Sequence, residues 1–479
     1  MPRAFITVLC LLLMGGASSV LAAGFDHVAR LADQGYRIGA QARLLDSGEV
    51  LAEIDPQRSL APASVSKLYM AAAALDRWGP QHRFTSRLVS TGAVDSRGVL
   101  HGDLVFEGGG DPALVSEDLW RLIQRLRQQG VESVKGQLVV SQWRFGPVEC
   151  VTTDRCRAES RADNAYSALL SAAAVNYGSW CLNVLPGHTV GGEARILSCD
   201  TVKPTTRIDN HVTTVAEGGD TRLDAERVTD AQGDVLVVRG KIAQGTYPRA
   251  IYRASSDPAE QTAQTLLAML GRAGIEVSGG AAVSRTQPPV AATRLAAVDG
   301  KPLQELLLRT LNYSNNFMAD TLSLDLVDTP RASLPEGGAA VAAFAESLPG
   351  HGPLTLKSGS GLTTENRTTA QGVNTLLAAM YQRPALFPTF VAGLQLPVNG
   401  PMRFIRRGDP LFQDHVMLKT GTLNQPFAVR ALGGYFRTRS GRWGSFSVLV
   451  NGTASTPYLS WSKVLDPVAE DLAAMIRAY

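Results

Sequence analysis

The sequence lacks the features by which nucleic-acid-binding proteins and metalloproteins are usually recognised. Its 479 residues carry a net charge of only +3, which gives no reason to expect a nucleic-acid partner. The mildly basic pI of about 8.6 suits a protein that acts on an anionic polymer. No Cys-x-x-Cys pair is present, and the seven histidines are scattered singly. We therefore expect neither a metal site nor a cofactor.

Long apolar runs are also scarce, and the one that exists lies near the N-terminus. Arg3 precedes an apolar run over residues 4–14, and Gly15-Gly16 interrupts it. The run is shorter than the roughly 20 residues that a membrane span needs, which favours a cleaved secretory signal over an uncleaved anchor. We predict a signal peptide over residues 1–23, cleaved near Ala22-Ala23, and a mature periplasmic protein without an integral membrane segment.

Cysteine is rare, and one of the five cysteines, Cys10, falls within the predicted signal. The other four are Cys150, Cys156, Cys181 and Cys199, within a stretch of about fifty residues. An even number of cysteines in an exported chain indicates disulfides. Three pairings are open, and the low entropic cost of short loops favours Cys150–Cys156 with Cys181–Cys199.

The pattern of apolar and turn residues divides the mature chain into three parts. Residues 24–83 predict a short helix, strands at 37–45 and 50–54, and a buried helix that begins at or just before Ser64. Residues 84–249 show short alternating segments between turns, which predicts an inserted β-rich region. Residues 250–479 predict helices at 259–273, 303–311 and 372–381, strands at 416–420, 427–436 and 445–451, and a last helix that starts at Asp466-Pro467. We expect an α+β fold in which 24–83 and 250–479 form one discontinuous domain, a sheet flanked by helices.

Three short motifs in chain order indicate serine acyl transfer. They are Ser64-Val65-Ser66-Lys67, Ser314-Asn315-Asn316 and Lys419-Thr420-Gly421-Thr422, a combination known from penicillin-binding proteins and β-lactamases. Serine needs an adjacent base to become a nucleophile. A lysine three residues along a helix lies on the same face, and an apolar helix lowers its pKa toward neutrality. We therefore predict Ser64 as nucleophile and Lys67 as its base.

The other two motifs supply what the acyl-transfer chemistry still needs. Ser314 offers a hydroxyl for proton relay, and Asn316 an amide to hold the substrate backbone. Gly421 allows close approach to a strand, while Lys419, Thr420 and Thr422 suit a terminal carboxylate. The start of the Ser64 helix provides N–H groups and a positive dipole end for the oxyanion.

With these motifs the chain resembles the low-molecular-mass penicillin-binding proteins of the D-alanyl-D-alanine carboxypeptidase/endopeptidase type, which carry a large inserted region. The resemblance extends to residues 60–68, 108–112, 256–258, 274–277, 358–362 and 432–436. It implies a penicillin-binding/β-lactamase-like transpeptidase domain with an antiparallel sheet. The implied partners are peptidoglycan peptides as substrates and β-lactam antibiotics as covalent inhibitors. The interval of about 250 residues between Ser64 and Ser314 exceeds what a compact β-lactamase can hold.

Two other functions compete with this one, and one segment departs from the family. A β-lactamase or esterase of the same superfamily would differ in how fast its acyl-enzyme turns over, and a non-catalytic penicillin-binding sensor would show broken motifs. Where the family has Asp-Gly-Ser-Gly-Leu-Ser-Arg, this chain has Thr364 in place of the arginine. That change bears on recognition of the stem peptide.

Four further features have ordinary structural explanations. Residues 108–111 (Gly-Gly-Gly-Asp) lack a following Gly-Lys-Ser/Thr and predict a tight turn. The sequence contains no Gly-x-Ser-x-Gly nucleophile elbow with which His415 could form a Ser-His-Asp triad, so we expect this histidine to be a structural residue within or beside a strand. Ser66 either tunes the lysine or packs against its helix, and Ser358 and Ser360 are expected to form a turn near the cleft.

Overall fold

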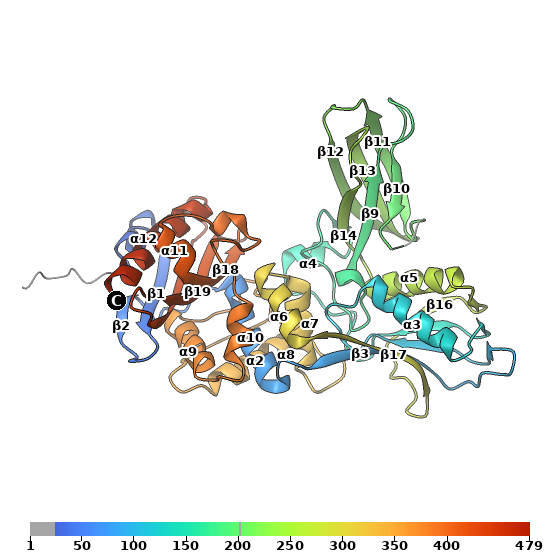
Figure 1. The fold of residues 1–479 in the computed structure, drawn as a ribbon, viewed down its shortest axis with the longest axis horizontal. Coiled ribbons are helices and arrows are strands. Elements are labelled where there is room, and N and C mark those ends of the chain that lie inside the picture. The colour runs from blue at the N-terminus through green and yellow to red at the C-terminus, as the bar shows by residue number, and fades with distance from the viewer. Residues whose placement is uncertain (1–23, 201–202) are drawn as a thin grey trace, which may run out of the picture.

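The computed structural model describes residues 24–200 and 203–479, so the predicted signal peptide lies outside the described residues. Figure 1 shows two α/β bodies side by side along the long axis, with a group of strands projecting from the right-hand one. Segments from both ends of the chain meet in the left-hand body, where blue and red elements adjoin.

The left-hand body is built on a five-stranded antiparallel sheet in the order β18-β19-β20-β1-β2. Its strands are β1 (Arg37–Leu44), β2 (Val50–Ile54), β18 (Val416–Leu423), β19 (Val429–Arg437) and β20 (Trp443–Asn451). β1 pairs directly with β20, which joins the N-terminal segment to the C-terminal one. Strands β19 and β20 are buried along almost their whole length, because helices cover both faces of the sheet.

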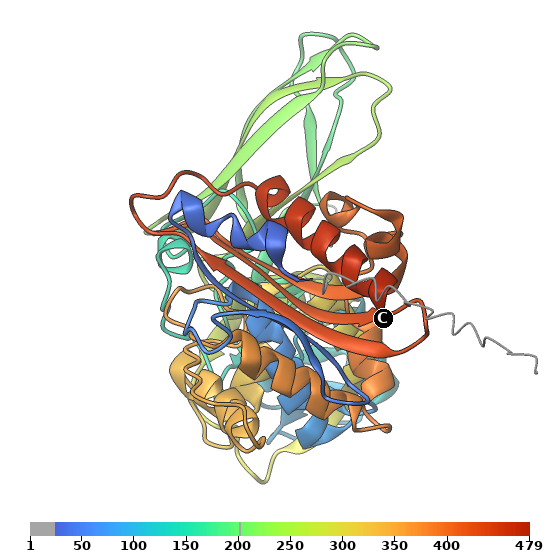
Figure 2. The same cartoon turned by 90° about the vertical axis from the view of Figure 1, so that its left-hand side faces the viewer.

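Helices lie on both faces of this sheet (Figure 2), and an apolar cluster packs on each face. One contains α1 (Asp26–Ala29), α11 (Pro410–His415) and α12 (Trp461–Ala478). The other contains α2 (Ser66–Trp78), α6 (Leu303–Asn312), α7 (Asn316–Asp325), α8 (Leu334–Glu346), α9 (Ala370–Tyr381) and α10 (Phe387–Ala392). The α+β prediction, a sheet flanked by helices, is confirmed.

The predicted start of the last helix is wrong. α12 begins at Trp461 with Ser460 as its N-cap, which accepts a hydrogen bond from the Lys463 amide, and Pro467 lies inside the helix. Proline in a helix interior loses one backbone hydrogen bond and is costly. Here the segment on either side of Pro467 buries Val464 and Val468 in the core, and this packing outweighs the local preference.

The right-hand body contains a second five-stranded sheet in the order β16-β7-β5-β3-β17. Its strands are β3 (Arg83–Ser90), β5 (Leu104–Glu107), β7 (Leu138–Ser141), β16 (Ala281–Ser284) and β17 (Thr293–Pro302). A small sheet of β4 (Val99–Leu100), β6 (Ser133–Val134) and β15 (Glu276–Val277) lies in the same body. Helices α3 (Ser116–Gln128) and α5 (Pro258–Arg272) share its apolar core. α3 lies in a stretch for which the sequence predicted mainly strands.

The projecting strands form two further sheets (Figure 1). One contains β9 (Ser179–Leu185), β10 (Arg195–Ser198) and β14 (Arg249–Ala254). The other contains β8 (Arg161–Ala162), β11 (Arg207–Val215), β12 (Arg222–Asp230) and β13 (Gly233–Ala243). The favoured disulfides are both present: Cys150–Cys156 closes a loop around α4 (Thr153–Arg157), and Cys181–Cys199 links β9 to the end of β10. Within residues 24–200 and 203–479, no helix is long and apolar enough to cross a membrane.

Candidate active site

The segment that carries Ser64 and Lys67 is a 3-10 turn, Ala63–Val65, that runs directly into α2. Ala63 has a positive φ of 46°, a conformation that costs energy for a residue with a side chain and that often occurs at functional sites. The buried side chains of Val65 and Leu68 anchor the turn in the core. The turn therefore presents the half-buried Ser64 in a fixed orientation, with Lys67 fully buried one turn further on.

Lys67 is the centre of the hydrogen-bond network. Its Nζ lies 2.8 Å from Ser64 Oγ, 2.8 Å from Asn316 Oδ1 and 2.7 Å from the Ser360 carbonyl oxygen. The last two partners can only accept, so they take two N–H groups of the amine. In the neutral amine the lone pair is then left for the third partner, the Ser64 hydroxyl. This geometry is the one that a general base for Ser64 requires.

Burial sets the protonation state of Lys67. It lowers the pKa of the ammonium from 10.5 to about 7, against a smaller raising effect of Asp320 and with a further lowering effect of Arg155. The charged and neutral forms are therefore both populated near neutral pH. The prediction that an apolar helix depresses this pKa is in line with the structure.

Ser314 and Asn316 lie at the start of α7, opposite Ser64. Asn315 caps this helix by accepting a hydrogen bond from the Met318 amide at 3.0 Å, and Ser314 has a positive φ of 54°. Asn316 links α2 to the segment between β8 and β9: its Oδ1 accepts from Lys67, and its Nδ2 donates to the Tyr166 carbonyl at 3.3 Å. Both ends of the amide are thus engaged before any substrate is bound.

Strand β18 forms the third wall of the site. Lys419 is fully buried and its Nζ donates to Ser314 Oγ at 2.9 Å and to the Thr420 carbonyl at 2.7 Å. Burial, with repulsion from Lys67 as a second cause, lowers the pKa of Lys419 well below its usual value. The Thr420 hydroxyl donates to Gln395 Oε1 at 2.9 Å, while Thr422 is exposed.

Gly421 has a structural role that the sequence did not indicate. A side chain there would lie 2.5 Å from the Pro62 carbonyl oxygen and 3.0 Å from the Ser64 amide nitrogen. The strand can therefore pack against the Ser64 turn only if this residue is glycine. Gly361 also packs against the Ser64 turn and must be glycine for the same reason, since a Cβ added there would lie 1.9 Å from the Ala63 carbonyl oxygen.

A buried ion pair lies beside Lys67 that the sequence did not predict. Arg155, on α4 within the Cys150–Cys156 loop, donates from Nη1 to Asp320 Oδ2 at 2.8 Å, and both side chains are almost fully buried. Asp320 Oδ1 also accepts from the Ser360 amide at 2.8 Å. The pair thus ties the inserted region to α7 and to the residue whose carbonyl holds Lys67. The spacing of Asp320 four residues after Asn316, on the same helix face, was the one available signal.

The other candidates from the sequence lie near the site in supporting positions. Ser66 Oγ accepts a hydrogen bond from Asn366 Nδ2 at 2.9 Å and packs inside the fold. Ser358 and Ser360 form the turn that approaches Lys67. His415 ends α11, where its Nδ1 lies 2.7 Å from the Arg437 carbonyl oxygen. Among the described residues, no cluster of three or more His, Cys, Asp or Glu side chains could hold a metal ion.

Two cavities adjoin the site. One of about 560 Å³ lies between α4 and the end of β18, and its lining includes Asp154, Arg157, Thr364 and Leu423. The other, of about 540 Å³, adjoins the Ser314-Asn315-Asn316 segment and extends toward the projecting strands. The eight predicted site residues come from three distant segments of the chain. The hydrogen bonds and close packing described above bring these three segments together, and among the eight residues only the exposed Thr422 side chain takes no part in those contacts.

Comparison with known proteins places this geometry in a family. Residues 23–470 match the D-Ala-D-Ala carboxypeptidase 3 (S13) family. A D-alanyl-D-alanine carboxypeptidase of an Actinomadura species is 29% identical over 442 residues, covering 89% of this chain and 79% of that protein. A D-alanyl-D-alanine carboxypeptidase of Haemophilus influenzae is 26% identical over 436 residues, covering 88% of this chain and 86% of that protein.

A solved structure has the same overall fold. The crystal structure of penicillin binding protein 4 from Haemophilus influenzae aligns with a TM-score of 0.73, at 21% sequence identity, over 94% of this chain and 98% of that one. The same protein in complex with a β-lactam aligns with a TM-score of 0.69 at 22% identity.

Proposed function

The chain belongs to the D-Ala-D-Ala carboxypeptidase 3 (S13) family, as a serine-type D-Ala-D-Ala carboxypeptidase, and on that premise we propose that it works through an acyl-enzyme on Ser64. The substrates in this proposal are stem peptides of peptidoglycan and the cross-links between them. The site of action is the periplasm, as the signal-like N-terminus suggests.

The first step is attack of Ser64 Oγ on the carbonyl carbon of the penultimate D-Ala. Neutral Lys67 takes the hydroxyl proton, and the carbonyl oxygen becomes an oxyanion beside the amide of Ser64 at the start of the helical segment. The carbon–nitrogen bond then breaks, and the leaving amine takes a proton that reaches it from Lys67 or through Ser314. Water next attacks the ester, again with Lys67 as base, and restores Ser64.

Recognition of the leaving residue falls to β18 in this proposal. A terminal carboxylate placed against Lys419 and Thr422 would restore the charged form of Lys419, because an opposite charge raises the pKa of a buried ammonium. The burial of Lys419, which keeps the pKa low in the free enzyme, makes this contact strong once it forms.

The observation that carries the proposal is the set of three partners around Lys67 Nζ. Two acceptors take its N–H groups and leave the lone pair for Ser64. β-Lactams would imitate the substrate and trap the same serine. A sensor or scaffold would not need this arrangement, and a β-lactamase would differ by hydrolysing the trapped ester rapidly.

The test is release of D-Ala from a pentapeptide ending in D-Ala-D-Ala. The wild-type enzyme should release it, whereas Ser64→Ala and Lys67→Ala should each lose several orders of magnitude in kcat, since the two residues act as a unit. Ser66→Ala is the matched control, because Ser66 lies next to both residues but its hydroxyl accepts its hydrogen bond from Asn366. Normal turnover by folded Ser64→Ala protein would refute the assignment.

A further inference from the structure

The cavity beside the Ser314-Asn315-Asn316 segment has a composition that the acyl-transfer chemistry does not explain. Its volume of about 540 Å³ is within the range of about 300–1,000 Å³ that is usual for small-ligand sites. Ser314 and Asn316 lie on its wall, so a ligand there would sit directly next to the reacting peptide. Its opposite wall comes from the projecting strands, through Tyr252 of β14 and the Cys181–Cys199 disulfide.

Exposed tyrosines gather around this cavity. Tyr166, Tyr252 and Tyr313 line it and are 50%, 53% and 63% exposed, although they come from three separate parts of the chain. Aromatic faces that remain in contact with water mark binding surfaces, because a ligand that covers them removes apolar area from solvent while the hydroxyl stays hydrated. The flat faces would stack on a ligand that is itself flat and rich in C–H groups on one side.

The polar groups of the cavity restrict the charge of its ligand. Glu117 and Asp200 supply carboxylates and Asn176 supplies an amide, and no Lys, Arg or His is among the described residues that line it. A ligand that carries carboxylates, as stem peptides do, would meet repulsion there and no compensating cation. A neutral ligand with many hydroxyl and amide groups would find the carboxylates as acceptors and the tyrosine hydroxyls of the lining as donors, whereas the Asn176 amide already donates to Ser116 and Asp200.

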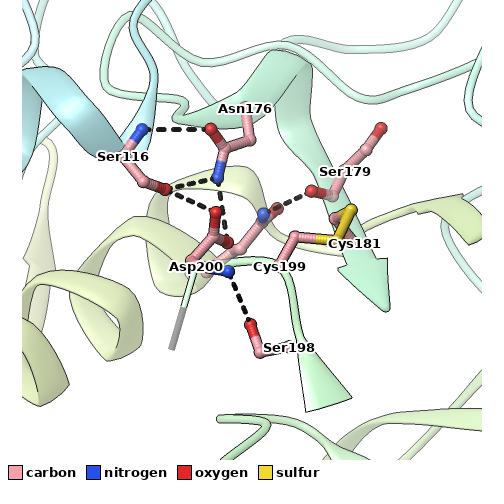
Figure 3. The surroundings of a disulfide bond; sticks show 8 residues. Ser116, Asn176, Ser179, Cys181, Ser198, Cys199 and Asp200 are labelled. Atoms are coloured by element: carbon pink, nitrogen blue, oxygen red, sulfur yellow. Dashed lines mark hydrogen bonds between the residues drawn. A yellow bond between two sulfur atoms is a disulfide. The ribbon is translucent and has the colours of Figure 1, made fainter. Parts of the chain in front are cut away.

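The wall around Asp200 is held in place by its own hydrogen bonds (Figure 3). Asp200 accepts from Ser116 Oγ at 2.7 Å and from Asn176 Nδ2 at 3.0 Å, next to the Cys181–Cys199 disulfide. Tyr177 and Phe317 also line the cavity, and their rings pack edge-on with centroids 6.3 Å apart. A site that is already ordered loses little conformational entropy on binding, which favours a dedicated ligand.

We propose that this cavity is a sugar subsite, which binds a neutral N-acetylated sugar of the peptidoglycan glycan strand while the attached peptide is held at Ser64. The inference rests on the proposed function. A stem of about four residues spans at most about 14 Å when extended, so a sugar at its far end stays within reach of a cavity that borders the catalytic segment. The subsite would make the enzyme prefer peptides that are still attached to glycan.

The experiment compares one pentapeptide in two forms, one with and one without the attached disaccharide. For the wild-type enzyme, kcat/KM for D-Ala release should be higher on the sugar-bearing form by about fivefold or more, as expected for one or two aromatic stacking contacts. Tyr252→Ala should bring the ratio of the two values close to one. Tyr252→Phe should keep the ratio, because the ring face remains.

Tyr247→Ala is the matched control, since Tyr247 is 88% exposed in the loop between β13 and β14 but does not line the cavity. It should leave the ratio at its wild-type value. Equal kcat/KM on both forms for the wild-type enzyme would refute the subsite. So would a Tyr252→Ala variant that slows both forms equally, which would instead assign the cavity to the peptide. Failure of the wild-type enzyme to cleave either form would refute the proposed function, and this outcome is distinguishable from the two that refute only the subsite.

Discussion

The pH at which the enzyme becomes active should depend on the burial of Lys67, and each partner of the Arg155–Asp320 ion pair should shift that pH in an opposite direction. Acylation needs neutral Lys67, so its rate should rise with pH, reach half of its maximum near the Lys67 pKa of about 7 and level off above it. Burial is the largest cause of the net lowering from 10.5 to about 7, which corresponds to about 5 kcal/mol at 1.36 kcal/mol per pKa unit. This net value already includes the two partners of the pair, of which Asp320 raises the Lys67 pKa and Arg155 lowers it.

Removing each partner should move the midpoint in an opposite direction. Arg155→Met removes a charge that lowers the Lys67 pKa, so the midpoint should rise by about one pH unit and the rate at pH 7 should fall about fivefold. Asp320→Asn removes the charge that raises this pKa, so the midpoint should fall by about one unit and the rate at pH 6 should rise about fivefold relative to its own plateau. The double variant should return close to the wild-type midpoint.

The assay is the rate of acylation by a chromogenic β-lactam between pH 5 and 9, for each variant at a temperature where it is folded. Removing one partner of a buried pair costs about 3–5 kcal/mol of stability, so the plateau rate alone decides nothing. Arg144→Met is the matched control, because Arg144 pairs with the buried Asp325 on the same helix α7 but does not affect Lys67. Equal midpoints in the wild type, Arg155→Met and Asp320→Asn would refute the electrostatic role of the pair.

Three further predictions concern the carboxylate anchor, specificity and export. Lys419→Ala should lower both peptide hydrolysis and acylation by penicillin by at least about tenfold, since both ligands lose a charge-assisted contact of about 1.5–3 kcal/mol, and unchanged rates would place the anchor elsewhere. With Thr364 in place of an arginine, the enzyme should prefer a free diaminopimelate carboxylate over its amide by less than about a hundredfold in kcat/KM. A larger preference that disappears in Arg157→Ala would show that Arg157, which lines the same cavity, has taken over the role. Protein from the periplasm should begin near Ala23 or Gly24 and gain the mass of four hydrogens on reduction, whereas four free thiols would contradict the two disulfides.

The sequence predicted best where the physics is local. The strand at residues 50–54 was predicted with its observed bounds, and the helix of Ser64 and the two short disulfides also follow from nearby residues. The start of α12 was missed because burial of Val464 and Val468 overrides the break expected at Pro467. Local sequence signals report on one segment only, whereas here packing against distant parts of the core determines where the helix begins.

The candidate site shows the same limit. The three motifs could be picked out because each one is short and contiguous in sequence. Arg155 gave no such signal, since it is one of many arginines and only the tertiary fold brings it to Asp320. For Gly421 the sequence likewise predicted only a role toward the substrate and did not indicate its close packing against the Pro62 carbonyl and the Ser64 amide. Contacts between segments more than a hundred residues apart leave no pattern in a single sequence.

The central claim is that Ser64 carries the acyl group, and mass spectrometry of the trapped enzyme tests it most directly. After reaction with benzylpenicillin, the intact wild-type protein should gain the mass of one penicillin molecule, and peptide mapping should place the adduct on Ser64. Ser64→Ala protein that is folded should gain no mass under the same conditions. An adduct of the same stoichiometry on the Ser64→Ala protein, or one mapped to Ser314 or Ser360, would contradict the account.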